Sequence, residues 1–119
     1  MRKEQRLRRR KDFAAAYRKG QAHGNQLLVL RVRPNGSDVT RVGFVVGRVV
    51  GGAVERNRVR RRLREIARAL PMRPGLDIVV GARKASASAP YVKLAGALRS
   101  LAKRGGALAE SGDTQEAAP

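Results

Sequence analysis

The sequence contains no cysteine and no tryptophan, and its aromatic residues are limited to two phenylalanines and two tyrosines. Without cysteine, the chain can form neither disulfides nor thiolate metal sites. No apolar run approaches the length of a membrane-spanning helix, and the N-terminus lacks the apolar core of a secretory signal. We therefore expect a cytoplasmic protein that makes no contact with membranes.

Acidic residues are also scarce, at nine against 27 lysines and arginines, which gives a net charge of +18. Glu110, Asp113 and Glu116 fall in residues 105–119, a stretch without lysine or arginine. Residues 1–104 therefore carry a net charge of +21. Such a charge is typical of a protein that binds a polyanion, of which nucleic acid is the commonest.

A chain of 119 residues is long enough for one domain with a modest core. Residues 1–10 form a basic N-terminal arm in which Leu7 is the one apolar residue after Met1. This arm is either disordered or in contact with a nucleic-acid backbone, and its composition fits both. We predict a folded domain over residues 11–104 and a disordered acidic tail over residues 105–119.

The periodicity of apolar residues predicts the order helix, short strand, strand, strand, helix, strand, helix. A turn at residues 34–38 predicts that the second and third strands form an antiparallel hairpin. The order fits a four-stranded sheet backed by two helices, with the first helix over part of the other face. The general rule for strand–helix–strand units predicts a right-handed crossover. The predicted segments are residues 11–19, 21–25, 27–33, 41–47, 51–70, 76–82 and 91–104.

The most informative segment is residues 51–70, which contains seven arginines and two glutamates. On a helix, one face would carry the apolar residues Val59, Leu63, Ile66, Ala67 and Leu70. The opposite side would carry Asn57, Arg61, Arg64 and Arg68, with Arg58 and Arg60 on the flanks. Arginines without balancing acids repel one another and destabilise a helix unless a polyanion neutralises them. Arginine in place of lysine favours bidentate contacts to phosphate, so this face predicts nucleic-acid binding.

The other candidate residues give weaker evidence about function. Phe13 and Tyr17 share one face of the first predicted helix, either as core or as a platform on which unpaired bases stack. His23 lies beside glycine in a turn or edge strand, which favours a surface residue. No acids or histidine have metal-ligand or triad spacing, and no phosphate-binding glycine loop occurs. The residues therefore predict a binding module with no catalytic residue and no metal site.

Residues 53–64, Ala-Val-Glu-Arg-Asn-Arg-Val-Arg-Arg-Arg-Leu-Arg, resemble the signature of the bacterial ribonuclease P protein subunit. That signature is an Arg-Asn-Arg core followed by further basic residues on a helix. Other segments resemble the family in the same order, and the resemblance covers roughly residues 3 to 104. These segments are Phe13-x-x-x-Tyr17 with Gly20, Arg41-Val42-Gly43-Phe44 with Arg48, and Gly81-Ala82-Arg83-Lys84.

The resemblance implies a fold and a function. The fold would be α+β, an αβββαβα two-layer sandwich like the second domain of a small-subunit ribosomal protein, with a left-handed crossover. The protein would be one subunit of an endoribonuclease in which the RNA subunit removes the 5′ leader of precursor tRNA. Its partners would be the ribonuclease P RNA and precursor tRNA, with no obligate protein partner. Mg²⁺ would belong to the RNA-containing holoenzyme, and the protein alone would bind no cofactor.

The resemblance also assigns roles by position. Arg31 stands where relatives often have an aromatic residue, so charge would replace stacking there, and Val49 stands where a lysine is common. Contacts to the catalytic RNA are implied for Arg56, Asn57, Arg58, Arg60, Arg61, Arg64 and Arg68. Contacts to the leader are implied for Phe13, Tyr17, Arg31, Arg83 and Lys84.

Two other hypotheses fit the composition. One is a ribosomal protein or a ribosome-assembly RNA-binding factor without processing activity, and the other is a DNA-architectural protein. A purely structural RNA clamp has no need for a stacking cleft at Phe13 and Tyr17. The arginine-rich helix lacks the base-reading Asn/Gln pattern and the dimerising partner helix of many DNA-binding proteins.

We expect sulfate or phosphate to raise the melting temperature of the free protein. The positively charged side chains of residues 1–104, with a net charge of +21, repel one another. An anion bound between arginines removes part of that repulsion and stabilises the folded protein. The measurement compares melting in sulfate with melting in chloride at constant ionic strength. Equal melting temperatures in the two salts would contradict this expectation.

Overall fold

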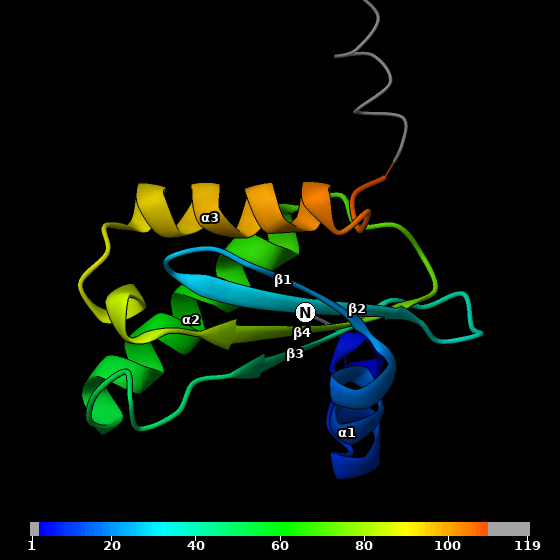
Figure 1. The fold of residues 1–119 in the computed structure, drawn as a ribbon, viewed down its shortest axis with the longest axis horizontal. Helices are drawn as coiled ribbons and strands as arrows, with labels where there is room; N and C mark the ends of the chain where they lie inside the picture. The colour runs from blue at the N-terminus through cyan, green and yellow to red at the C-terminus, as the bar shows by residue number, and fades with distance from the viewer. Residues whose placement is uncertain (1–2, 110–119) are drawn as a thin grey trace, which may run out of the picture.

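In the computed structural model, which describes residues 3–109, the chain forms one sheet and three α-helices (Figure 1). The order of helices and strands confirms the expected αβββαβα arrangement, to which two short 3-10 helices, η1 and η2, are added. The elements are η1 (Lys3–Gln5), α1 (Arg10–Lys19), β1 (Gln21–Gly24), β2 (Leu28–Pro34), β3 (Arg41–Val45), α2 (Ala53–Ala69), β4 (Leu76–Ala82), η2 (Lys84–Ala87) and α3 (Tyr91–Arg104).

The sheet has the strand order β1-β2-β4-β3. β4 lies between β2 and β3, antiparallel to β2 and parallel to β3, so the hairpin predicted for residues 27–33 and 41–47 is wrong. The chain does turn after Pro34, but Asn35 donates its backbone N–H to Gly75, the residue before β4, at 2.9 Å. β4 takes the central place because its residues from Leu76 to Val80 are buried on both faces of the sheet.

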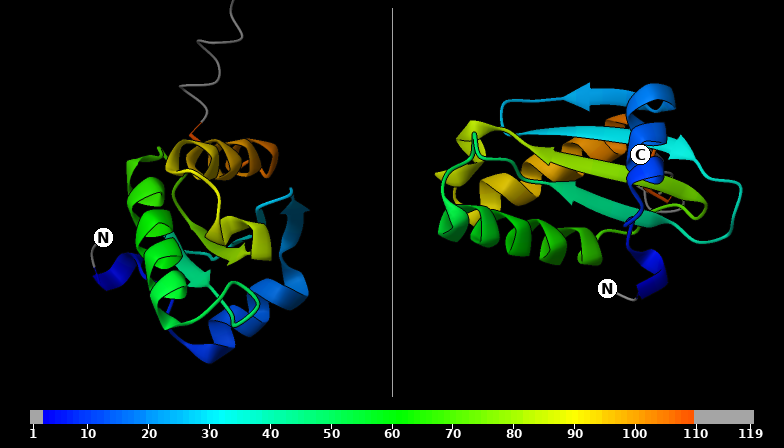
Figure 2. Two further views of the ribbon diagram at one scale, coloured as in Figure 1. Left: turned by 90° about the vertical axis from the view of Figure 1, so that its left-hand side faces the viewer. Right: turned by 90° about the horizontal axis from the view of Figure 1, so that it is seen from below.

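The unit formed by β3, α2 and β4 is a left-handed crossover. α2 lies behind the sheet in Figure 1, and the views in Figure 2 place it on the other side of the sheet from α1. The right-handed expectation from the general rule is therefore wrong, and the expectation from the family resemblance holds. A right-handed crossover would place α2 on the face that α1 and the N-terminal segment occupy.

The main core lies between the sheet and the two helices α2 and α3. The alternation predicted for β2 is confirmed, because Leu28, Leu30 and Val32 are buried on the face toward these helices. The last helix contributes Leu94 and Leu98 to the same core, again as its periodicity predicts. Over residues 3–109, no helix combines the length and the apolar character that crossing a bilayer requires.

α1 covers only one end of the other sheet face. Ala16 is fully buried there beside Val79, and the Phe13 ring lies directly over Gly43. A Cβ atom built on Gly43 would come within 2.5 Å of Phe13 Cζ. Glycine at this position therefore lets the helix approach the sheet closely.

The N-terminal segment is part of the fold. Leu7 is 4% exposed, packs with Phe13, and donates its backbone N–H to Val42 at 3.0 Å. Arg6 forms a parallel bridge to Val42 on the free edge of β3. The disordered alternative for residues 1–10 is therefore wrong for residues 3–9, because one apolar side chain is enough to anchor them.

Arg41 holds α1 onto the sheet. Its guanidinium donates two hydrogen bonds to the carboxylate of Asp77 on β4, at 2.9 and 2.7 Å, and one to Asp12 on α1, at 3.2 Å. Asn35 donates a further hydrogen bond to Asp77, whose side chain is 2% exposed. The hydrogen bond to Asp77 raises the pKa of Arg41. The buried carboxylate is thus paired, which removes most of the penalty of burying it.

The ordered domain extends beyond the predicted boundary at residue 105. Ala107 and Leu108 are buried, and Leu108 forms a bridge to Met72. Arg73 donates its backbone N–H to Ala107 at 2.7 Å. The predicted tail is therefore wrong for residues 105–109, and residues 110–119 lie outside the described residues.

We expect Gly43→Ala to lower the free energy of unfolding by about 1–3 kcal/mol, because the new methyl group would overlap the Phe13 ring. The measurement is urea unfolding. Gly47→Ala is the matched control, since a Cβ built there meets nothing within 4 Å. Equal stabilities of the two variants would contradict the close packing of α1 on β3.

Candidate nucleic-acid interface

α2 lies within the predicted segment 51–70, from Ala53 to Ala69. Gly51 has a φ angle of 151°, which side chains rarely allow, and Gly52 is the N-cap. Glu55 lies in the first turn, where a negative charge stabilises the helix. The helix ends at Ala69, and Pro71 follows shortly after. Its buried face consists of Val59, Leu63, Ile66 and Ala67, as the periodicity predicts.

The outer side of α2 carries a surface that we call the arginine face. It consists of Asn57, Arg60, Arg61, Arg64 and Arg68. Arg60 donates to the Asn57 side chain at 3.0 Å, whereas within residues 3–109 the other three arginines make no hydrogen bond or ion pair. Both ion pairs of the described part of the chain belong to Arg41. The arginine face is therefore uncompensated positive charge, which attracts a polyanion and is stabilised by one.

Two arginines of α2 have different surroundings. Arg58 donates to the backbone oxygen of Ala87 at 3.1 Å, and its Nε atom is buried. Arg62 lies half-buried and donates to the backbone oxygen of Ala89 at 3.5 Å. Both side chains thus tie α2 to the segment that follows β4. The implied RNA contact of Arg58 stays a prediction, and the structure adds this packing role.

The uncovered end of the second sheet face forms a cleft of about 260 Å³. Its floor is the row Val29, Gly81 and Val45, which lie opposite one another on β2, β4 and β3. Gly81 has no side chain, and a Cβ built there would come no closer than 3.7 Å to Val29 O, so the middle of the floor is hollow. Tyr17 from α1 and Arg83 from the end of β4 line the sides of the cleft.

Tyr17 and Arg31 contact each other inside this cleft. Arg31 Cζ lies 4.4 Å from the centroid of the Tyr17 ring, which is the geometry of a cation–π interaction. Tyr17 is 46% exposed, so its ring is a surface aromatic and not a core residue. A stacked ring and guanidinium offer flat surfaces for an unpaired base and a positive charge for its phosphate.

Phe13 and Lys84 do not line the cleft. Phe13 is half-buried against Leu7 and lines a neighbouring groove of about 240 Å³, together with Arg60 and Arg64 of the arginine face. Lys84 is exposed at the start of η2. Of the five implied leader residues, the structure therefore brings Tyr17, Arg31 and Arg83 together. Sequence reasoning missed three further residues of the neighbouring groove, Arg6, Arg8 and Phe44.

The acids and the histidine of the described residues do not form a reactive site. Asp12 and Asp77 share Arg41, and Glu65 accepts a hydrogen bond from Tyr91 at 3.0 Å. His23 lies on the edge strand β1 and is half-buried, with an Nε2 atom that has no hydrogen-bond partner within residues 3–109. No group of three or more His, Asp or Glu residues between positions 3 and 109 could hold a metal ion. These side chains therefore do not fit a magnesium ion held by the protein.

The Arg41 network was a second feature that sequence reasoning missed. The sequence feature that could have indicated this network is Asp77, a carboxylate inside the otherwise apolar segment 76–82. A charge buried in a central strand needs a partner. The identity of that partner depends on the sheet order, which places Arg41 directly opposite Asp77.

We expect Arg58→Gln to lower the free energy of unfolding by about 1–3 kcal/mol and to speed amide exchange in η2, because the hydrogen bond to Ala87 is lost. Arg61→Gln is the matched control, since Arg61 is exposed and makes no hydrogen bond or ion pair within the described part of the chain. Hydrogen exchange and urea unfolding of both variants provide the measurement. A loss of stability of the same size in the Arg61 variant would contradict the packing role of Arg58.

Comparisons with known proteins agree with this geometry. The model of the ribonuclease P family matches residues 1–106. The ribonuclease P protein component of Streptomyces bikiniensis is 44% identical over 103 residues, which cover 77% of this chain and 84% of that protein. The corresponding protein of Clostridium botulinum, strain Loch Maree, is 37% identical over 107 residues, covering 87% of this chain and 96% of that protein.

Solved structures that superpose on this chain are also RNase P proteins. The RNase P protein from Staphylococcus aureus superposes with a TM-score of 0.80 at 26% identity, covering 88% of this chain and 98% of that one. The RNase P protein from Thermotoga maritima superposes with a TM-score of 0.74 at 36% identity, covering 83% of this chain and 96% of that one. With the family model matching nearly the whole described domain, the chain belongs to the ribonuclease P protein family.

Proposed function

We propose that this chain is the protein subunit of a cytoplasmic ribonuclease P ribonucleoprotein that removes the 5′ leader of precursor tRNA. Its arginine face would bind the catalytic RNA, and its cleft would bind the single-stranded leader. The observation that carries the proposal is that Arg61, Arg64 and Arg68, on the helix that bears the family signature, have no hydrogen-bond or ion-pair partner within residues 3–109.

The arginine face suits a structured RNA. Arg61, Arg64 and Arg68 point outward from one side of a helix of 17 residues, so they can reach successive phosphates. Arg56 and Asn57 extend the same contacts toward the start of the helix. Arg58 would support them by holding the segment that carries Arg83 and Lys84 beside α2.

The cleft suits a single strand. An unpaired base can stack on the Tyr17–Arg31 pair, whereas the bases of a duplex are already stacked on one another. Arg83, which also lines the cleft, would supply positive charge for the leader backbone. Phe13 would act indirectly, because its packing against Leu7 holds the helix that carries Tyr17.

The protein would contribute binding and position, and the RNA subunit would carry the chemistry. Magnesium, when held by the RNA, would supply an activated water and neutralise charge at the cleaved phosphate. The protein's own residues would hold the leader in a fixed position relative to the RNA. This would align the scissile bond with the catalytic groups of the RNA. The relatives and solved structures named above are ribonuclease P proteins, which does not favour the ribosomal alternative.

We expect Tyr17→Leu to lower the affinity of the holoenzyme for precursor tRNA by roughly 5- to 150-fold, because stacking contributes about 1–3 kcal/mol per base. Affinity for mature tRNA should hardly change, since it has no leader. The measurement is the ratio of the two affinities, beside the melting curve of the free variant.

Tyr91→Leu is the matched control, because Tyr91 is also exposed but lies on α3 outside the cleft. Phe13→Leu should instead lower the melting temperature, since Phe13 packs on the sheet. A precursor-to-mature ratio that stays unchanged in the Tyr17 variant would contradict the leader assignment.

A further inference from the structure

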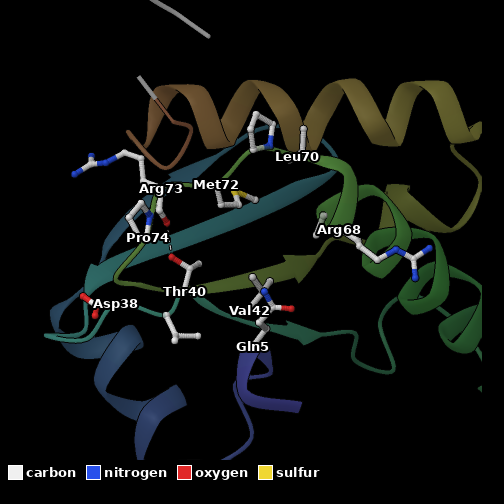
Figure 3. Close-up of a pocket in the computed structure, with 12 residues that line it drawn as sticks. Gln5, Asp38, Thr40, Val42, Arg68, Leu70, Met72, Arg73 and Pro74 are labelled. Carbon is white, nitrogen blue, oxygen red and sulfur yellow. Dashed lines mark hydrogen bonds between the residues drawn. The ribbon is translucent and has the colours of Figure 1, made fainter. Parts of the chain in front are cut away.

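A third depression lies at the opposite end of the sheet from the cleft, beside the C-terminal end of α2 (Figure 3). Its volume is about 470 Å³, within the range of ligand pockets in proteins. We call it the α2-end groove. Val39, Val42, Leu70 and Met72 give it an apolar lining, and Arg68 and Arg73 lie at its margins.

The walls of this groove are fixed before any ligand binds. On one side, the Asn35 side chain donates to Val39 O at 2.9 Å, and Ser37 Oγ accepts from Val39 N at 3.0 Å. Thr40 joins this wall to the other, because its hydroxyl donates to Arg73 O. On the far side, the bridge between Met72 and Leu108 holds the loop that follows α2. A preformed groove costs little conformational entropy when it is filled.

The groove continues the arginine face. Arg68 is the last residue of that face and also lines the groove, so a chain of phosphates that follows α2 would arrive at its mouth. In Figure 3 the Arg68 and Arg73 side chains point to opposite sides, and Leu70, Met72 and Val42 lie between these two residues. Neither guanidinium has a carboxylate partner within residues 3–109.

From this geometry we infer that the α2-end groove binds an unpaired nucleotide of the RNA that occupies the arginine face. The base would lie against Val39, Leu70 and Met72, and the flanking phosphates would lie near Arg68 and Arg73. Asp38 at the rim repels phosphate and accepts hydrogen bonds, so it would face the edge of the base. This inference rests on the proposed function, because it takes the RNA subunit as the ligand.

The absence of cysteine makes a direct test possible, because one introduced cysteine can carry a short photoreactive aryl azide. The labelled variants are Val39→Cys in the groove, Arg61→Cys on the arginine face and Val92→Cys on α3. Val92 is 74% exposed and lies outside the groove. Each variant is bound to the full-length ribonuclease P RNA, irradiated, and mapped by primer extension.

We expect position 39 to cross-link to one short unpaired stretch of the RNA, and position 92 to give no discrete product. Cross-links from position 61 alone would overturn the inference and leave the proposed function standing. A cross-link from position 39 to residues 110–119 of the same chain would also overturn it. The absence of RNA cross-links from all three positions would contradict the proposed function itself.

An affinity measurement provides a second test. Val39→Glu and Val92→Glu each add one negative charge at an exposed valine, so they change the net charge of the protein by the same amount. We expect the Val39 variant to bind the RNA subunit at least about fivefold more weakly than the Val92 variant, because it also loses the groove contact. Equal affinities of two variants with similar melting curves would overturn the inference.

Discussion

The contact on which both binding surfaces depend is the hydrogen-bonded group of Arg41, Asp77 and Asp12. It fixes α1 over one end of the second sheet face, where Asp77 is buried between two strands. Because α1 is held there, the other end of that face stays uncovered and forms the cleft with Tyr17 at its side. The same helix occupies part of the face on which α2 would lie in a right-handed crossover. The group therefore sets the position of the cleft and the side of the sheet that carries the arginine face.

Electrostatics divide the arginines of this chain into two groups. Arg41, Arg58 and Arg62 donate to a carboxylate or to backbone oxygens and contribute to the fold. Arg61, Arg64 and Arg68 have no partner within the described residues, so they raise the energy of the free protein by mutual repulsion. A polyanion that binds the second group relieves this repulsion. RNA binding therefore stabilises the folded protein, because the bound phosphates relieve the repulsion between the arginines of α2.

The sequence predicted the elements and their buried faces well. The alternation in β2 and the helical spacing of Val59, Leu63 and Ile66 depend on local geometry, which periodicity reports directly. The predictions were wrong where contacts between segments distant in the sequence determine the structure. A turn after Pro34 is a local signal, but the insertion of β4 beside β2 depends on which strand is apolar on both faces. The packing of Leu7 in the N-terminal arm and of Leu108 in the predicted tail was not predicted, because a single apolar residue gives no periodic pattern. For the site, the family resemblance named candidate residues, and the structure places Tyr17 in the cleft and Phe13 in the packing between α1 and the sheet.

The identity of the bound RNA tests the central claim most directly. The protein can be cross-linked to RNA in its own cells, purified under denaturing conditions, and the attached RNA sequenced. The account predicts enrichment of the ribonuclease P RNA together with tRNA precursors that keep their 5′ leaders. Enrichment of ribosomal RNA, with neither of these species above background, would contradict it.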